Sequence, residues 1–205
     1  MSLNSYQALQ TAYTKTYFNA CGLLEEAQLL LDNDKYARTY LLAHISIEEF
    51  ARCIMLASAS IKFKVRALDT KKLIKRQTNH QSKIQVAYSF VEKLKQFKSP
   101  LSVEDRMEIL GHFDKVISDD DIQKLDDLKN ASFYTDQYEN QTKMPSEVIT
   151  SEKANEILSS ANLLKELIEA NNWHEGENLI NTVKRLDNDQ INLLKTFYYG
   201  DQRKV

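Results

Sequence analysis

Helix-breaking residues are scarce in this sequence. Its 205 residues include four glycines and two prolines, whereas average usage would give about 24 of the two together. This scarcity leaves little material for tight hairpins, glycine-rich phosphate loops or a linker between domains. Cysteine is also rare, with Cys21 and Cys53 the only two. A disulfide framework or a cysteine metal cluster is therefore excluded.

Several recognisable segments and motifs are missing as well. No apolar run approaches the roughly 18 residues that a bilayer crossing needs, and residues 1–5 lack the basic and apolar regions of a signal peptide. No GxxxxGK[ST], GxGxxG, GxSxG or HExxH motif occurs, which excludes typical P-loop ATPases, dehydrogenases and α/β-hydrolases and argues against a zinc site. We expect a cytoplasmic protein with no metal, no cofactor and no membrane partner.

Helical periodicity dominates what is present. Apolar residues recur at spacings of three and four along most of the chain. The pattern predicts long helices at residues 3–31, 35–63, 70–97 and 177–199, another beginning near Thr150, and short helices at 103–113 and 120–134. Residues 137–145 are expected to form a loop. The fold class is therefore all-α: an antiparallel bundle of long helices with an extra C-terminal helix. We expect one helical domain at 1–172 and a helical extension at 173–205.

Charge is unevenly distributed along the chain. The 27 basic and 29 acidic residues nearly balance overall, but residues 62–98 hold eleven basic and two acidic side chains, and residues 102–128 hold nine acidic and three basic ones. Clustered Lys and Arg bind RNA by releasing counterions from phosphate, which makes Lys72, Lys75 and Arg76 candidate binding residues. The alternative is a solvated helix face that the acidic segment balances.

Ionisable side chains lie on the apolar face of the predicted helix 35–63. At 100° per residue, His44, Glu48 and Arg52 fall inside the apolar arc, and Glu49 falls at its edge. Glu48 and Arg52 have the i, i+4 spacing of an intrahelical ion pair. Charges on a core-facing stripe are unfavourable unless they are paired and hydrogen-bonded. The cluster is therefore either a ligand or active site, or a buried pair that fixes the register of the helix.

The predicted helix 70–97 has a similar pattern. Two polar residues, Gln77 and His80, occupy core positions of a heptad that also contains Leu73, Ile84, Ala87, Val91 and Leu94. His80 is either a satisfied core histidine or an acid–base group that faces the Glu48 stripe.

Three separated segments combine into a recognisable pattern. Leu42–Arg52 fits L-A-x-x-S/A-x-E-E-x-x-K with Arg52 in place of the final Lys, and His80–Lys83 fits H-x-x-K. A late segment supplies Lys129, Tyr134, Asp136, Pro145 and Ile149–Thr150. In this order and spacing the chain, over about residues 5–170, resembles the AbiV family of abortive-infection proteins, which belongs to the HEPN superfamily of helical domains.

The resemblance implies a fold, a biology and an assembly. The fold would be a HEPN-like antiparallel bundle, and the biology would be bacterial anti-phage defence by abortive infection. HEPN domains usually pair, so a homodimer is implied. Many HEPN proteins are metal-independent ribonucleases with an R-x4–6-H motif, in which Arg holds phosphate and His transfers protons.

Candidate site residues follow from the same resemblance and from the basic segment 62–98. The candidate catalytic residues are Glu48, Arg52, His80, Lys129 and Tyr134, and the candidate binding residues are Glu49, Lys83 and Asp136 together with Lys72, Lys75 and Arg76. Arg52, Lys83 and Lys129 would hold phosphate, His80 would act as base, and Glu48 would orient Arg52 or His80. The Lys129–Tyr134 spacing matches R-x4-H with the residue types changed. Arg106 and His112 also have a matching spacing, but they lie in the acidic segment, and we interpret that match as coincidental.

Two functions remain open from the sequence. The first is an effector that stays silent until a phage-encoded activator protein binds and then shuts down translation, with RNA or the ribosome as target. The second is a ribonuclease that cleaves RNA directly. The altered Arg/His motif favours the first, and a helical scaffold with no defence role is a third alternative.

Overall fold

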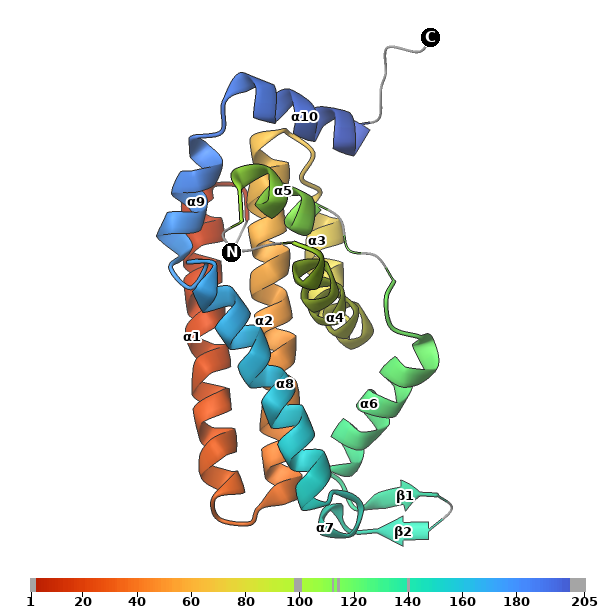
Figure 1. Ribbon diagram of the computed structural model, residues 1–205. Coiled ribbons are helices and arrows are strands. Elements are labelled where there is room, and N and C mark those ends of the chain that lie inside the picture. Colours follow the sequence, from red (N-terminus) through yellow and green to blue (C-terminus); the bar gives the residue numbers. More distant parts are fainter. Residues whose placement is uncertain (1–2, 98–100, 112, 114, 140, 200–205) are drawn as a thin grey trace.

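A long antiparallel helical hairpin forms the frame of the molecule (Figure 1). The computed structural model describes residues 3–97, 101–111, 113, 115–139 and 141–199. Helix α1 (Tyr6–Leu31) begins at Ser5, whose side chain accepts a hydrogen bond from the Ala8 backbone N–H. A short turn, with Asp34 in a left-handed conformation, leads to α2 (Tyr36–Lys64). The helices predicted at residues 3–31 and 35–63 are confirmed.

Helix α2 is the central element of the core. It is buried along most of its length because α1, α4 (His80–Gln96) and α8 (Ser151–Ala170) all pack against it. Small residues let α1 and α2 approach closely: Ala20 and Ala43 are fully buried, and Ser46 Oγ donates a 2.8 Å hydrogen bond to the Ala20 carbonyl. Long-range packing, rather than propensity alone, therefore holds this helix in place.

The predicted helix 70–97 is wrong in its continuity. The structure contains α3 (Thr70–Thr78) and α4, separated at Asn79, which has extended backbone angles. The Asn79 side chain accepts a 2.7 Å hydrogen bond from the Ser82 N–H and so starts a new helix. Because the helix is broken, the heptad does not continue through it. His80, predicted in a core position, has a side chain that is 56% exposed, and Gln77 is only partly buried.

The predicted helix 177–199 is also two helices, α9 (Gly176–Lys184) and α10 (Asn188–Tyr199). The break is a reciprocal cap: the Gln190 N–H donates to Asp187 Oδ1, and the Asp187 N–H donates to Gln190 Oε1. Helix α10 consequently does not continue in the direction of α9 but crosses the end of α2 (Figure 1). Whether residues 173–205 form a unit separate from the rest stays a prediction.

The segment between α4 and α8 is mostly short elements. Helix α5 (Val103–Gly111) packs on α2 and α4, and α6 (Asp119–Ala131) also contacts both. The expected loop at 137–145 instead contains a small antiparallel hairpin, followed by a single helical turn. These elements are β1 (Asp136–Tyr138), β2 (Gln141–Lys143) and α7 (Pro145–Val148).

The all-α fold class is otherwise confirmed. Beyond the β1–β2 hairpin, the regular elements of the described chain are helices. None of these helices combines the length and the apolarity that a bilayer crossing requires.

Two glycines give a matched test of the packing. A Cβ added at Gly22, within α1, would meet no atom within 4 Å, whereas one at Gly176 would lie 2.8 Å from Thr14 Oγ1 and 3.2 Å from the buried Tyr13 ring. We expect Gly22→Ala to raise the free energy of unfolding by about 0.5–1 kcal/mol, because alanine favours a helix. Gly176→Ala should lower it by about 1 kcal/mol through overpacking. Urea denaturation measures both, and a stabilising Gly176→Ala would contradict the α1–α9 contact.

Candidate functional site

A buried carboxylate on α2 lies at the centre of the candidate site. Glu48 is 2% exposed, and its oxygens lie 2.7 and 2.8 Å from His80 Nδ1. Lys83 Nζ donates a hydrogen bond to the same carboxylate. His44 Nε2 is 3.5 Å and Lys129 Nζ is 3.9 Å from Glu48 Oε1. We call these five residues the Glu48 cluster.

Three helices supply the Glu48 cluster. His44 and Glu48 lie one turn apart on α2, His80 and Lys83 lie three residues apart in the first turn of α4, and Lys129 lies near the end of α6. Residues three apart share a helix face, so the first turn of α4 presents both of its side chains to one carboxylate. The positive end of the α4 dipole also favours an anion near this turn. The break after α3 therefore puts the N-terminal turn of a new helix next to Glu48.

The charge on Glu48 is stabilised by its neighbours. Burial raises the pKa of Glu48, but the contacts with His44, Lys83 and His80 outweigh it and hold the pKa well below its usual range. Lys129 also donates a hydrogen bond to Asp126 on the same helix. Two lysines thus face two carboxylates, and the buried part of the site is close to neutral when the histidines are uncharged.

The His80 ring is the accessible part of the Glu48 cluster. Its side chain is 56% exposed, and among the described residues its Nε2 makes no hydrogen bond. A carboxylate that accepts from Nδ1–H leaves the lone pair on Nε2, where it can take a proton from a bound group. This arrangement can perform general base chemistry at the surface.

The two lysines of the Glu48 cluster lie in positions that suit a supporting role. Lys83 is buried and donates to Glu48, and Lys129 has a mostly buried side chain that binds Asp126. A phosphate group could reach either ammonium only by displacing a carboxylate. Their predicted role as phosphate ligands stays a prediction, and their burial favours holding α4 and α6 against α2.

Arg52 and Glu49 form a separate pair. The expected Glu48–Arg52 ion pair is wrong, since Arg52 Nη1 lies 2.7 Å from Glu49 Oε1. Glu49 Oε2 also accepts a hydrogen bond from Asn19 on α1. The reason is competition: cationic side chains from α4 already occupy Glu48, and the sequence of α2 alone cannot reveal them. Arg52 therefore pairs with Glu49, which also contacts α1, and forms no ion pair with Glu48 among the described residues.

Tyr134 does not join the Glu48 cluster. Its side chain is 57% exposed, and its ring packs edge-on against Phe133 at a centroid distance of 4.6 Å. It makes no contact with Glu48 or His80 among the interactions of the described chain. Asp136 begins β1, but its side chain lies outside the described residues, as does His112, the second residue of the coincidental Arg106 match.

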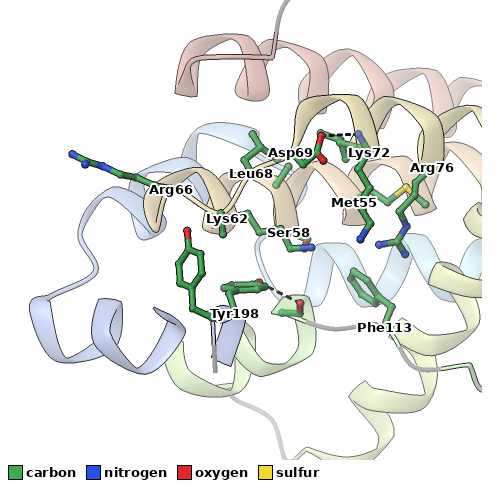
Figure 2. Close-up of a pocket in the computed structure, with 15 residues that line it drawn as sticks. Met55, Ser58, Lys62, Arg66, Leu68, Asp69, Lys72, Arg76, Phe113 and Tyr198 are labelled. Carbon is green, nitrogen blue, oxygen red and sulfur yellow. Dashed lines mark hydrogen bonds between the residues drawn. The ribbon is translucent and has the colours of Figure 1, made fainter. Parts of the chain in front are cut away.

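The basic residues of α3 face another part of the molecule. Lys72 and Arg76 line a cavity of about 640 Å³ next to α2, together with Lys62 and Arg66 (Figure 2). Lys75 is exposed and does not line that cavity. The basic segment 62–98 is therefore not one continuous surface, because Lys83 is buried at the Glu48 cluster.

Some participants could not be assigned from the sequence. His44, on the apolar stripe of α2, gave only its i, i+4 spacing to Glu48, and Asp126 gave only its i, i+3 spacing to Lys129. In the part of the chain described by the structure, no group of three or more His, Cys, Asp or Glu side chains is arranged to hold a metal ion.

Removal of the central charge tests the Glu48 cluster. Glu48→Gln should lower the free energy of unfolding at pH 7 by about 3–5 kcal/mol, because Lys83 would be left buried without its counter-ion. Since folding lowers the pKa of Glu48, its charge adds stability above the ordinary value of 4.5 and loses this effect as the pH falls toward the folded pKa. The difference between wild type and variant should therefore shrink below pH 4.5.

A surface pair provides the control for this measurement. Glu92→Gln removes the carboxylate of the exposed Glu92–Lys95 pair and should change stability by less than about 0.5 kcal/mol at any pH. Equal effects of the two substitutions in urea titrations would contradict the burial and pairing of Glu48.

A comparison with models of protein families identifies the family of this chain. The family model HEPN_AbiV, described as AbiV, matches residues 8–166, a range that contains all five residues of the Glu48 cluster. Comparisons with curated proteins and with solved structures gave no match. The family match spans more than half of the sequence and agrees with the helical bundle on which the Glu48 cluster is built. The chain therefore belongs to the AbiV family of HEPN proteins.

Proposed function

We propose that this chain is an abortive-infection effector that stops translation, and with it growth, in the phage-infected cell. The observation that carries the proposal is the AbiV family match over residues 8–166. A phage-encoded protein would be the trigger. Two copies of this chain would form a homodimer, and RNA or the ribosome in the cytoplasm would be the target.

The electrostatics of the Glu48 cluster support a mainly non-catalytic role. Glu48 engages Lys83 and His80, and Asp126 engages Lys129, so these buried charges already have partners. Glu49 holds Arg52 in the same way. A phosphodiester that entered this site would meet cations already neutralised by carboxylates. Such a site suits a silent protein that acts through binding.

Direct ribonuclease activity is the second candidate, and the His80 geometry favours it. With Glu48 on Nδ1, the exposed His80 Nε2 could accept the proton of a ribose 2′-hydroxyl. The 2′ oxygen would then attack the adjacent phosphorus, and the 5′ oxygen would leave with a proton from water. This route needs no metal ion.

Infection of cells that carry variants of this chain separates the two candidates. We expect phage infection of cells with wild-type protein to stop protein synthesis while ribosomal and messenger RNA stay full-length. His80→Ala should retain this arrest, because the proposed effector does not need a base. Pulse labelling of protein and gel analysis of total RNA measure the two outcomes in the same culture.

An exposed neighbour in the same turn of α4 serves as the matched control. Gln81→Ala should behave as wild type in every assay, since this side chain lies on the surface outside the Glu48 cluster. RNA fragments that appear with wild type and Gln81→Ala but disappear with a folded His80→Ala would overturn the first proposal in favour of the ribonuclease. If phage grow equally well in cells with any of the three proteins and in cells without the protein, both proposed functions are contradicted.

A further inference from the structure

A second site lies about 15 Å further along α2 than Glu48, given ten residues from Glu48 to Ser58 at a rise of 1.5 Å each. It is a cavity of about 640 Å³ between two walls (Figure 2). The last turns of α2, the connection to α3 and α3 itself form one wall, and the end of α5 and α10 form the other. Small-molecule sites in proteins usually occupy about 300–1,000 Å³. We call this cavity the cationic pocket.

Unpaired positive charge is concentrated in the cationic pocket. Lys62 from α2 and Lys72 and Arg76 from α3 line it, and Arg66 extends outward at its rim (Figure 2). Among the described residues, no carboxylate lies within ion-pair distance of any of these four side chains. Asp69, the acidic residue of the lining, caps α3 by accepting a 2.9 Å hydrogen bond from the Lys72 backbone N–H.

Crowding of these cations has an electrostatic cost that an anion would relieve. Burial lowers the pKa of Lys62, and the nearby positive charges of Arg76 and Lys72 lower it further. Burial likewise lowers the pKa of Arg76. The contrast with the Glu48 cluster is direct: there each lysine faces a carboxylate, whereas here no carboxylate of the described residues forms an ion pair with these cations.

The remaining lining offers polar and aromatic contacts. Ser58 is buried in the α2 wall, where its hydroxyl interacts with the Tyr198 hydroxyl. The rings of Phe113 and Tyr198 add an aromatic surface to the lining, and Lys62 Nζ lies 5.5 Å from the Tyr198 ring centroid. A ligand with an anionic part and a flat apolar part would satisfy both walls.

Helix α10 builds its share of the cationic pocket from outside the family match. The match ends at residue 166, whereas Tyr198 and Tyr199 belong to α10. Tyr198 donates a 3.2 Å hydrogen bond to the Gly111 carbonyl, and Tyr199 donates one of 3.2 Å to the Val65 carbonyl. These bonds hold α10 across the cavity. The cationic pocket is therefore a feature of this chain that the matched segment alone does not form.

We propose that the cationic pocket binds a small molecule that carries two or more linked phosphate groups on an apolar or aromatic group, the chemistry of a nucleoside di- or triphosphate. Three inward-facing cations match an oligophosphate better than a single carboxylate or phosphate. Walls on both sides favour a compact ligand over a nucleic-acid strand, which needs an open groove along its backbone.

Calorimetric titration of the purified full-length protein at low salt tests the proposal. The probes are inorganic orthophosphate, pyrophosphate, ATP and GTP. We expect pyrophosphate to bind at least tenfold more tightly than orthophosphate, and at least one triphosphate to bind more tightly than pyrophosphate. Pyrophosphate binding equal to that of both triphosphates would overturn the aromatic half of the proposal, and a free oligophosphate would then be the ligand.

Two neighbouring residues of α3 give a matched pair of charge reversals. Arg76→Glu, inside the cationic pocket, should weaken triphosphate binding at least tenfold. Lys62→Met, which keeps a side chain of similar length but removes its charge, should have the same effect. Lys75→Glu changes the net charge by the same amount as Arg76→Glu but lies outside the pocket, and should change affinity less than twofold. Circular dichroism checks that each variant is folded.

Three results would overturn the proposal. The first is no measurable binding of any phosphate probe by the wild-type protein. The second is an equal loss of affinity in Lys75→Glu and Arg76→Glu, which would indicate diffuse surface attraction. The third is a single-stranded RNA oligonucleotide whose binding is lost in Arg76→Glu but is not displaced by excess triphosphate, which would assign the cationic residues to RNA instead.

Discussion

The buried negative charge of Glu48 determines how the rest of this bundle is arranged. A carboxylate removed from water loses several kcal/mol of solvation, and only well-placed cations and hydrogen bonds can restore it. In this chain the compensation comes from other helices, from Lys83 and His80 on α4 and Lys129 on α6. The charge on α2 is therefore compensated by the first turn of α4 and by the inward-facing Lys129 of α6.

The break between α3 and α4 links the two sites of the molecule. In a continuous helix Arg76 and His80, four residues apart, would share one face. Because Asn79 ends α3 and caps α4, Arg76 lines the cationic pocket while His80 contacts Glu48. Asn79 thus separates the Glu48 cluster, whose lysines are paired with carboxylates, from the cationic pocket, whose cations have no such partner among the described residues.

Much of the fold was visible in the sequence, because α1, α2 and α8 carry long apolar stripes at helical spacing. The breaks were harder to see. Asn79 and Asp187 each interrupt a sound apolar spacing, and their signals are local caps: Asn79 with the Ser82 N–H, and the reciprocal pair of Asp187 and Gln190. The β1–β2 hairpin was missed because its strands are three residues long and polar.

The candidate site was predictable only in part, for a related reason. An apolar stripe shows that Glu48 turns toward the core, but not which cation meets it there. Intrahelical spacing suggested Arg52, whereas the partners come from residues 32 and 35 positions away on α4. Tyr134 matched a motif spacing, yet it lies on the surface because α6 ends at Ala131. The pairing of charges between helices is decided by tertiary packing, which no single helical pattern contains.

A double-mutant cycle between Glu48 and Lys83 tests the central claim most directly. Glu48→Gln and Lys83→Met, alone and together, give the coupling free energy of the pair from urea denaturation at pH 7. The account predicts a coupling of about 2 kcal/mol or more, and a smaller one for the parallel cycle with Lys129→Met, whose ammonium is 3.9 Å from the carboxylate. A Glu48–Lys83 coupling below about 0.5 kcal/mol, the range of exposed pairs, would contradict it.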